Sequence, residues 1–369
     1  MAEIKKVIGL MSGTSLDGID AAVLETDGEG FAVSGPALTV PYAPELRAIL
    51  RGAMDVAAKA GGAARQLDSV REAEIRLTDA HAEVVQRLMQ EAGLAPHEIA
   101  YLGFHGQTIL HRPAERLTVQ LGEGDRLARA TGVSVVNDFR GADVAAGGQG
   151  APLVPLYHAA LVRARPHAGP VVVVNIGGVA NVTFVGTDGE LLAFDTGPGN
   201  APIDDWAMRH LGVPVDRDGV LARRGRVHAD ILYAMLRHPY FDVSPPKSLD
   251  RLDFTFDAVN KLSPSDGAAT LTEFTAASLA RAIEHFPAVP MTWIICGGGR
   301  RNPALMMALR RRLNNVVAAE ELGWRGDFLE AEAFAYLAIR SVKNLPLSLP
   351  TTTGVPHPMT GGRVHEYRA

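Results

Sequence analysis

Apolar runs separated by short polar turns open the chain. Val7 to Leu10 are apolar, residues 12–18 are polar or glycine, and apolar positions return from Ile19 to Leu24. Two apolar runs joined by a glycine-bounded polar turn predict a strand, a tight turn and a second strand. Phe31 to Tyr42 are expected to add a third strand, and residues 44–93, rich in Ala, Glu, Arg and Leu, are expected to be helical.

The same pattern returns in the second half of the chain. Val171 to Asn175 are strongly β-branched, residues 176–181 predict a turn, and Val182 to Val185 predict another strand. Leu191 to Phe194 are expected to form a third strand. Two hairpins of this type, about half a chain apart, indicate two similar domains.

The remaining elements fill the space between and after the hairpins. Short strands are expected at 99–102, 117–121, 133–136 and 291–296, and helices at 126–131, 203–211, 270–285, 304–313 and 329–343. Residues 104–108, Phe-His-Gly-Gln-Thr, are expected to form a loop. Strands alternating with helices favour an α/β fold.

The first polar turn has a composition suited to a phosphate chain. Its glycines allow close backbone approach, and the hydroxyls of Ser12, Thr14 and Ser15 add neutral donors. Asp17 and Asp20 would repel a bare phosphate, so they suggest a divalent cation between carboxylate and phosphate. The turn is not a Walker A loop, because GxxxxGK[ST] is absent and a strand follows. A plain hairpin turn explains the same residues equally well.

Three further segments carry candidate chemistry at strand ends. Arg140 follows a strand and could bind a carboxylate or phosphate with two hydrogen bonds. Asp195 follows a strand beside a Gly-Pro-Gly turn and is the best placed candidate general base, although an Asx-turn or helix cap is the alternative. The triplet Gly297 to Gly299 lies between a strand and a helix, a plausible seat for a nucleotide.

Composition limits the class of protein. The chain has 369 residues, 47% of them hydrophobic and 21% charged, with a net charge of −5. This length predicts two domains with a cleft between them. No apolar run is long enough to span a bilayer, so we expect no membrane partner and a cytoplasmic protein. The negative charge argues against nucleic acid as a partner. The single cysteine, Cys296, is expected to be a buried structural thiol.

Several motifs together resemble one family. GLMSGTSLDGID, FHGQT, NDFRGADVAAGGQGAPLVP, NIGGVANVT, FDTGPGN, CGGGRRNPALM and TGVPHPMTGG, between residues 9 and 362, look like the 1,6-anhydro-N-acetylmuramic acid kinases of bacterial cell-wall recycling. The resemblance implies an α/β fold of two actin-like, ribonuclease-H-like domains with the active site in the cleft between them. We expect an N-terminal domain at 1–140, a C-terminal domain at 141–345, and a tail at 346–369 that packs back on the first domain.

The implied reaction uses ATP and Mg²⁺. ATP would phosphorylate O6 while water attacks the anomeric carbon and opens the 1,6-anhydro ring, giving N-acetylmuramic acid 6-phosphate and ADP. Asp195 matches the family's general base for this water. The resemblance also suggests a homodimer.

The same resemblance assigns binding roles by motif. The ATP phosphates and adenosine would contact three glycine-containing segments: Gly13, Thr14, Ser15, Leu16, Asp17, Gly18, Ile19 and Asp20; Gly177, Gly178 and Asn181; and Gly297, Gly298 and Gly299. Asp17 would hold the metal, directly or through water. The sugar and its lactyl carboxylate would lie near His105, Gln107, Arg140 and Glu330, with Arg140 as the natural carboxylate partner.

One segment departs from the family, and other functions stay open. Residues 247–253, Lys-Ser-Leu-Asp-Arg-Leu-Asp, stand where members often carry a KSTGRE-like sequence, which puts that loop's role in doubt. The alternatives are a kinase of an ordinary amino sugar with Asp195 deprotonating a free 6-hydroxyl, a non-catalytic sugar-sensing regulator, and an actin-like structural ATPase.

Overall fold

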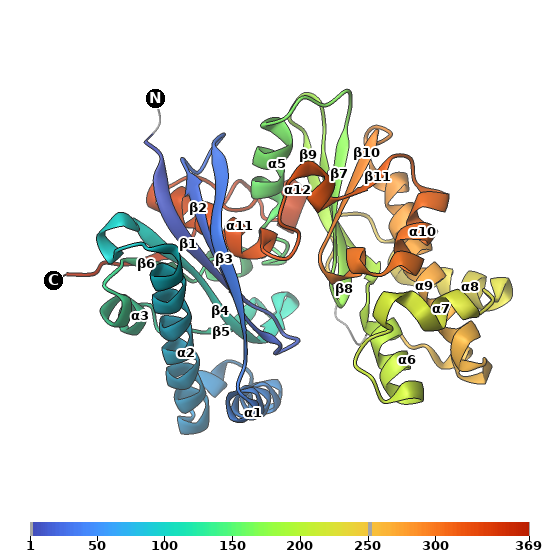
Figure 1. Ribbon diagram of the computed structural model, residues 1–369, viewed down its shortest axis with the longest axis horizontal. Coiled ribbons are helices and arrows are strands. Elements are labelled where there is room, and N and C mark those ends of the chain that lie inside the picture. The colour runs from blue at the N-terminus through green and yellow to red at the C-terminus, as the bar shows by residue number, and fades with distance from the viewer. Residues whose placement is uncertain (1–2, 250–252, 369) are drawn as a thin grey trace. The chain divides into compact units, whose positions relative to one another are not determined.

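The computed structural model describes residues 3–249 and 253–368, and the chain forms two compact units (Figure 1). The first unit comprises Met1–Arg165 and Phe328–Ala369, and the second comprises Pro166–Asp327. These boundaries differ from the expected division at 140/141 and 345/346. The helix at 329–342 lies on the first sheet at Gly9 and Gly103, and the helix at 155–163 contacts that helix through Tyr157 and Tyr336, so both belong to the first unit.

The first unit is built on a mixed sheet with strand order β12-β6-β4-β1-β2-β3, and β5 pairs with β4. Pairing is antiparallel along β1-β2-β3 and parallel from β1 to β4 and from β4 to β6. The strands are β1 (Lys5–Ser12), β2 (Gly18–Thr26), β3 (Ala32–Pro41), β4 (Tyr101–Arg112), β5 (Leu117–Leu121), β6 (Val135–Asn137) and β12 (Arg363–His365). The tail strand β12 pairs antiparallel with β6.

Helices cover both faces of this sheet. The unit contains α1 (Pro44–Ala60), α2 (Asp68–Ala92), α3 (Gly124–Thr131), α4 (Gly141–Ala145), α5 (Pro155–Arg163), α11 (Leu329–Val342) and α12 (Pro350–Thr353). Alternate residues of β1 point to opposite faces. Ile8 and Leu10 enter the core with Leu50 of α1 and Leu77 of α2, whereas Gly9 lies against α11.

The packing of α11 depends on missing side chains. A β-carbon at Gly9 would overlap the Ala331 carbonyl oxygen and lie 2.7 Å from the Ala335 nitrogen. A β-carbon at Gly103 would overlap the Phe334 carbonyl oxygen. The helix backbone therefore lies directly on the sheet, which is why a segment 320 residues from the N-terminus belongs to the first unit.

The second unit repeats the topology. Its sheet has the order β11-β10-β7-β8-β9, antiparallel along β7-β8-β9 and parallel from β7 to β10 and from β10 to β11. The strands are β7 (Val171–Ile176), β8 (Val179–Val185), β9 (Leu191–Pro198), β10 (Thr292–Cys296) and β11 (Val316–Ala318). The helices are α6 (Ala201–Leu211), α7 (Val220–Arg224), α8 (Ala229–Leu236), α9 (Pro264–Arg281) and α10 (Pro303–Arg312).

Each unit thus has a meander of three antiparallel strands whose first strand pairs in parallel with a later one. The predicted α/β fold with two domains of the actin-like kind is confirmed by this repeated order. In the second unit, Val172, Val174 and Phe194 pack with α9 and α10 on one face of the sheet. The residues next to them along each strand point to the other face.

Two local predictions were wrong. Residues 104–108 form part of the continuous strand β4 and not a loop, because β4 pairs with β1 on one edge and with β5 on the other. The second hairpin turn is shorter than expected. β8 begins at Val179, so Asn181 lies on a strand and only Gly177 and Gly178 connect β7 to β8. In the described part of the chain, no helix is long and apolar enough to cross a membrane.

Candidate active site

The first turn, residues 13–17, joins β1 to β2 in the first unit. The Leu16 N–H donates to the Gly13 carbonyl at 3.1 Å, and Leu16 has a positive φ of 57°. Leu16 and Ile19 point into the core, so only their backbone could face a ligand. Thr14, Ser15 and Asp17 are exposed. The turn therefore presents two hydroxyls and one carboxylate to its surroundings.

The two carboxylates of this hairpin have different partners. The Asp17 side chain is 77% exposed and forms an ion pair with Arg47 at 3.3 Å. Asp20 lies on β2, and its Oδ1 accepts a hydrogen bond from the Thr39 hydroxyl at 2.5 Å. The described residues contain no group of three or more His, Cys, Asp or Glu side chains that could hold a metal. Mg²⁺ that is held mainly by substrate phosphates needs only one or two carboxylates, so Asp17 fits that kind of site.

Gln107 supports the first turn from β4. Its side chain is fully buried, and its Nε2 donates to the Gly13 carbonyl at 3.0 Å. The Tyr42 hydroxyl donates to the Gln107 Oε1 at 3.4 Å. The Ser12 hydroxyl donates to the Gly106 carbonyl at 3.0 Å. Through these hydrogen bonds, the FHGQT motif on β4 fixes the shape of the first turn.

His105 and Arg140 form a buried pair whose protonation is defined by its partners. The His105 Nδ1 lies 2.7 Å from the Gly106 carbonyl, an acceptor, so Nδ1 carries the proton. The Arg140 Nε and Nη2 then donate to the His105 Nε2 at 3.1 and 3.0 Å. Burial and the Arg140 charge hold the pKa of His105 well below its usual value. The imidazole is therefore neutral and orients the guanidinium.

The loop after Arg140 is fixed by Asp143 of α4. The Gly150 N–H and the Thr353 hydroxyl each donate to the Asp143 carboxylate at 2.6 Å. The Gly150 carbonyl in turn accepts from the Arg140 Nη1 at 2.5 Å. Burial lowers the pKa of Arg140, and Glu330 of α11 and Asp143 oppose that shift. The C-terminal tail thus reaches Arg140 through three hydrogen bonds, by way of Asp143 and Gly150.

His105 also borders a polar pocket within the first unit. The pocket has a volume of about 670 Å³ and includes Asn137 at the end of β6 and the N-terminus of α3. Arg140, Gln107 and Glu330 do not line it. This pocket therefore contains only one of the four residues predicted to contact the sugar.

Asp195 lies within β9 and not after it. The register between β8 and β9 shifts between Ala180 and Asn181, which leaves Thr196 as an extra residue beside Asp195. The Asp195 N–H donates to the Lys247 carbonyl at 3.0 Å, and the Leu249 N–H donates to the Asp195 Oδ2 at 2.8 Å. Burial raises the pKa of the Asp195 carboxyl to about 7, and the Leu249 hydrogen bond acts in the opposite direction.

Asp195 ends a row of polar side chains across the sheet. Cys296 pairs with Asn175, Asn175 with Asn181, and Asn181 with Asp195. Residues paired across strands share a face, and this face is opposite the one packed on α9 and α10. The Asn181 Oδ1 is buried and accepts no hydrogen bond from the residues that the structure describes. Asn181 therefore belongs beside the candidate base and not in the turn.

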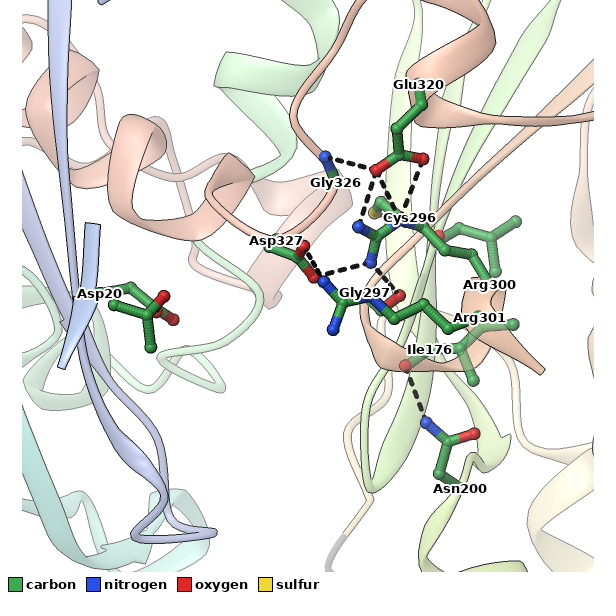
Figure 2. Close-up of polar contacts among 12 residues, drawn as sticks. Asp20, Ile176, Asn200, Cys296, Gly297, Arg300, Arg301, Glu320, Gly326 and Asp327 are labelled. Atoms are coloured by element: carbon green, nitrogen blue, oxygen red, sulfur yellow. Dashed lines mark hydrogen bonds and ion pairs between the residues drawn. The ribbon is translucent and has the colours of Figure 1, made fainter. Parts of the chain in front are cut away.

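The glycine triplet lies against the end of β7. Gly297 has a φ of 71°, and a β-carbon there would overlap the Asn175 Oδ1 and lie 2.7 Å from the Ile176 carbonyl oxygen. A β-carbon at Gly299 would lie 2.5 Å from the Ile176 side chain. The Asn200 Nδ2 donates to the Ile176 carbonyl at 3.2 Å (Figure 2). Gly297 and Gly299 are thus required by contact with the protein itself, which does not depend on a nucleotide, whereas a β-carbon at Gly298 would lie 3.6 Å from the Asn200 Nδ2.

Arg300 ties the triplet to the last residues of the second unit (Figure 2). Its side chain is 5% exposed, and its Nη1 donates to the Gly297 carbonyl at 2.7 Å and to the Asp327 Oδ1 at 2.9 Å. Its Nη2 lies 2.7 Å from the Glu320 Oε1. Burial alone would lower the pKa of Arg300, but its bonds to the two carboxylates raise it. Arg301 also pairs with Asp327.

The structure thus gathers the predicted residues into two sets, one in each unit. The first turn, Gln107, His105 and Arg140 are connected in the first unit, and Glu330 acts on Arg140 through its charge. Asp195, Asn181, the Gly177-Gly178 turn and the glycine triplet are connected in the second. Sequence reasoning missed Asn175, Asn200, Arg300 and the role of Lys247. Asn175 could have been found from its place one residue before the end of a β-branched strand.

Comparison with known proteins identifies the family. The sequence model of the family described as anhydro-N-acetylmuramic acid kinase matches residues 5–366. The anhydro-N-acetylmuramic acid kinase of Rhodospirillum rubrum is 55% identical over 357 residues, which is 96% of this chain and 92% of the relative. That of Paramagnetospirillum magneticum is 53% identical and covers 97% of this chain and 99% of the relative.

The chain belongs to the anhydro-N-acetylmuramic acid kinase family. It is therefore a kinase, and its substrates are a sugar and ATP. The family resemblance predicted from the motifs is confirmed.

Solved structures with similar folds are more distant. The activator of the 2-hydroxyisocaproyl-CoA dehydratase from Clostridium difficile with bound ADPNP has a TM-score of 0.46 at 13% identity, over 92% of this chain and 96% of that chain. A ROK family glucokinase from Streptomyces griseus in complex with glucose and AMPPNP has a TM-score of 0.41 at 14% identity, over 90% and 98%.

Proposed function

We propose that this anhydro-N-acetylmuramic acid kinase couples two bond changes in one reaction. Asp195 takes a proton from water, and the water oxygen bonds to the anomeric carbon. The bond from that carbon to O6 breaks, and O6 bonds to the γ-phosphorus of ATP as ADP leaves. The products are N-acetylmuramic acid 6-phosphate and ADP, and the water proton remains on Asp195 until solvent removes it. The role that follows is peptidoglycan recycling in the cytoplasm.

The environment of Asp195 carries this proposal. A general base works best with a pKa near the operating pH, and burial raises the pKa of Asp195 to about 7. The Leu249 N–H holds one carboxylate oxygen, and the other oxygen accepts no hydrogen bond from the described residues 3–249 and 253–368, so its lone pairs would take the water molecule. The neighbouring Asn175 and Asn181 add neutral polar groups on the same face.

The residues of the first unit would bind the sugar and the phosphates. Arg140 has five N–H donors, of which His105 and the Gly150 carbonyl engage three. The remaining donors would pair with the lactyl carboxylate, with Glu330 near the sugar hydroxyls. Thr14, Ser15 and the glycines of the first turn, with Gly177, Gly178 and Gly297 to Gly299, would contact ATP. Mg²⁺, held by Asp17 directly or through water, would neutralise charge on the phosphates. We also propose a homodimer.

The test is isotope incorporation. The purified protein is incubated with ATP, magnesium and 1,6-anhydro-N-acetylmuramic acid in oxygen-18 water, and the sugar phosphate is weighed after an early quench. One heavy oxygen in the product, and no product from Asp195→Asn, is the expected result. Asp188→Asn is the matched control, because Asp188 is an exposed carboxylate at the other end of the same β8-β9 hairpin. Phosphorylation of a free amino sugar without turnover of the anhydro sugar would favour an ordinary sugar kinase.

The pH dependence tests the same base. Only the ionised carboxylate accepts a proton, so kcat should fall about tenfold per pH unit below about pH 7. Because burial raises the pKa of Asp195 from 3.8 to about 7, the fold loses stability as the pH rises between these two values, and the full loss is present above pH 7. The Asp195→Asn protein should therefore melt no lower than the wild type at pH 8, which excludes misfolding as the cause of lost activity.

A further inference from the structure

Residues 247–249 run beside Asp195 like a short added strand. The Lys247 carbonyl accepts from the Asp195 N–H at 3.0 Å, and two residues later the Leu249 N–H donates to the Asp195 carboxylate at 2.8 Å. This segment therefore touches both the backbone and the side chain of the candidate base. Residues 247–249 make these contacts through their own backbone atoms only, so the contacts tolerate the change from the family's KSTGRE-like sequence to Lys-Ser-Leu. Residues 250–252 of that loop lie outside the described residues.

Lys247 anchors this segment. The residue is 7% exposed, and its Nζ donates to the Tyr240 carbonyl at 3.1 Å. The ammonium also lies 4.6 Å from the centre of the Tyr240 ring and 5.8 Å from that of Phe194. The Tyr240 hydroxyl donates to the Asp195 carbonyl at 2.6 Å. Lys247 and Tyr240 therefore hold Asp195 from two sides, through bonds that depend on each other.

We infer that Lys247 is a positioning residue for the reaction, which fixes residues 247–249 so that the Leu249 N–H orients the Asp195 carboxylate. This inference rests on the proposed role of Asp195 as general base. The ammonium does not touch the carboxylate; it acts through the segment that it anchors. Burying a lysine among aromatic rings costs free energy. Here the buried lysine fixes the segment whose backbone N–H donates a hydrogen bond to the base.

The groups around Lys247 determine how it responds to pH. Burial lowers the pKa of Lys247 to about 8, Arg281 of α9 lowers it further, and Asp242 and Glu284 oppose the shift. His285 lies on the turn after α9, and burial, then Lys247, lowers its pKa from 6.5. Burial therefore moves the pKa values of His285 and Asp195 in opposite directions. The Leu249 amide, which donates to the Asp195 carboxylate, is the probe that assigns a kinetic change near pH 7 to Asp195.

The first experiment compares variants at position 247. Lys247→Met keeps the length of the side chain and removes the ammonium, and Lys247→Arg restores a cation. The hydrogen bond from Leu249 favours the charged carboxylate, so its loss should raise the acid limb of kcat by about one pH unit, the effect of one hydrogen bond to an ion. We expect kcat at pH 7 to fall about fivefold in Lys247→Met with KM unchanged within about twofold, and Lys247→Arg to recover most of the loss.

Matched controls separate positioning from general damage. Lys261→Met removes an exposed lysine of the same unit and should leave the pH profile unchanged. Leu249→Met changes the side chain but keeps the backbone N–H and should also keep the wild-type acid limb. A wild-type acid limb and kcat in Lys247→Met, or a shifted limb in Leu249→Met, would overturn the inference.

A second measurement needs no change at position 247. In wild-type protein labelled with nitrogen-15 leucine, the Leu249 amide resonance should titrate with the midpoint of the kinetic acid limb, because its N–H bonds to the group that titrates. A Leu249 resonance that does not move across this range overturns the inference even if Lys247→Met fails to fold. The two proposals fail separately. Full activity in Asp195→Asn rejects the base, whereas an inactive Asp195→Asn with a wild-type-like Lys247→Met rejects only the role of Lys247.

Discussion

The contact of α11 with the first sheet makes a sharp prediction for Gly9→Ala. The new β-carbon would overlap the Ala331 carbonyl oxygen and lie 2.7 Å from the Ala335 nitrogen. Non-bonded heavy atoms prefer about 3.5–4.0 Å, so the Ala331 carbonyl oxygen, and α11 with it, must move away by roughly 1.5–2 Å. Both neighbours are backbone atoms of a helix, so no rotamer change can relieve the overlap. The sheet side is also fixed, because β1 pairs with β2 and β4.

The cost follows from this rigidity. Overpacking a core costs about 1–3 kcal/mol, and a clash with backbone on both sides belongs at the upper end, about 3 kcal/mol. For a unit of this size each kcal/mol lowers Tm by about 2–4 °C, so Gly9→Ala should melt about 6–12 °C lower than the wild type. Amide hydrogen exchange in α11 should also become faster, because this helix loses its close packing on the sheet.

Gly52→Ala is the matched control. Gly52 lies in the middle of α1 in the same unit, and a β-carbon there meets nothing within 4 Å. Alanine is favoured over glycine in a helix by about 0.5–1 kcal/mol, so this variant should melt slightly higher than the wild type. The assay is calorimetry of both variants, with amide exchange of α11. If Gly9→Ala melts within a degree or two of the wild type, the account of this packing is refuted.

Three further results are expected. Thr353→Val removes a hydrogen bond to the Asp143 carboxylate, which fixes the loop beside Arg140. KM for the anhydro sugar should therefore rise about tenfold without a change in KM for ATP. Thr351→Val, at an exposed neighbouring residue, should change neither KM. Arg300→Met should destabilise the second unit by about 2 kcal/mol in a denaturant titration, whereas Arg301→Met, at a side chain that is 67% exposed, should have almost no effect. Cys296 donates to a buried carbonyl, so it should resist a thiol reagent in native protein and react after unfolding; fast native labelling would contradict this.

The apolar runs and glycine turns of the two hairpins allowed this part of the fold to be predicted from the sequence. Residues 7–10 and 171–174 are apolar without interruption because central strands are buried on both faces. Each run is followed by a glycine turn and a second strand, so both meanders could be predicted. The parallel partners β4 and β10 were found from apolar runs as well.

Pairing over long distances could not be read in this way. The polar side chains of His105 and Gln107 suggested a loop. The strand continues there because β1 and β5, on its two edges, provide hydrogen-bond partners for its backbone. The division into units was also hidden. The small residues of α11 allow close packing, but only its contacts with Gly9 and Gly103 show which sheet it packs on.

The candidate base illustrates why motif and geometry gave different parts of the site. The motif FDTGPGN pointed to Asp195, but the face on which its side chain lies is set by the regular pairing of β8 with β9 up to Asn181 and Asp195. The extra residue, Thr196, follows Asp195, and its hydroxyl donates to the Ala180 carbonyl at 3.1 Å. The bulge therefore changes the register only from Gly197 onward, where β9 enters the Gly-Pro-Gly turn. The hydrogen bond to the carboxylate comes from a loop residue 54 positions later, through a backbone amide that no side-chain pattern reveals. Motifs therefore identify the reacting group, whereas its environment comes from the register and from backbone contacts between distant segments.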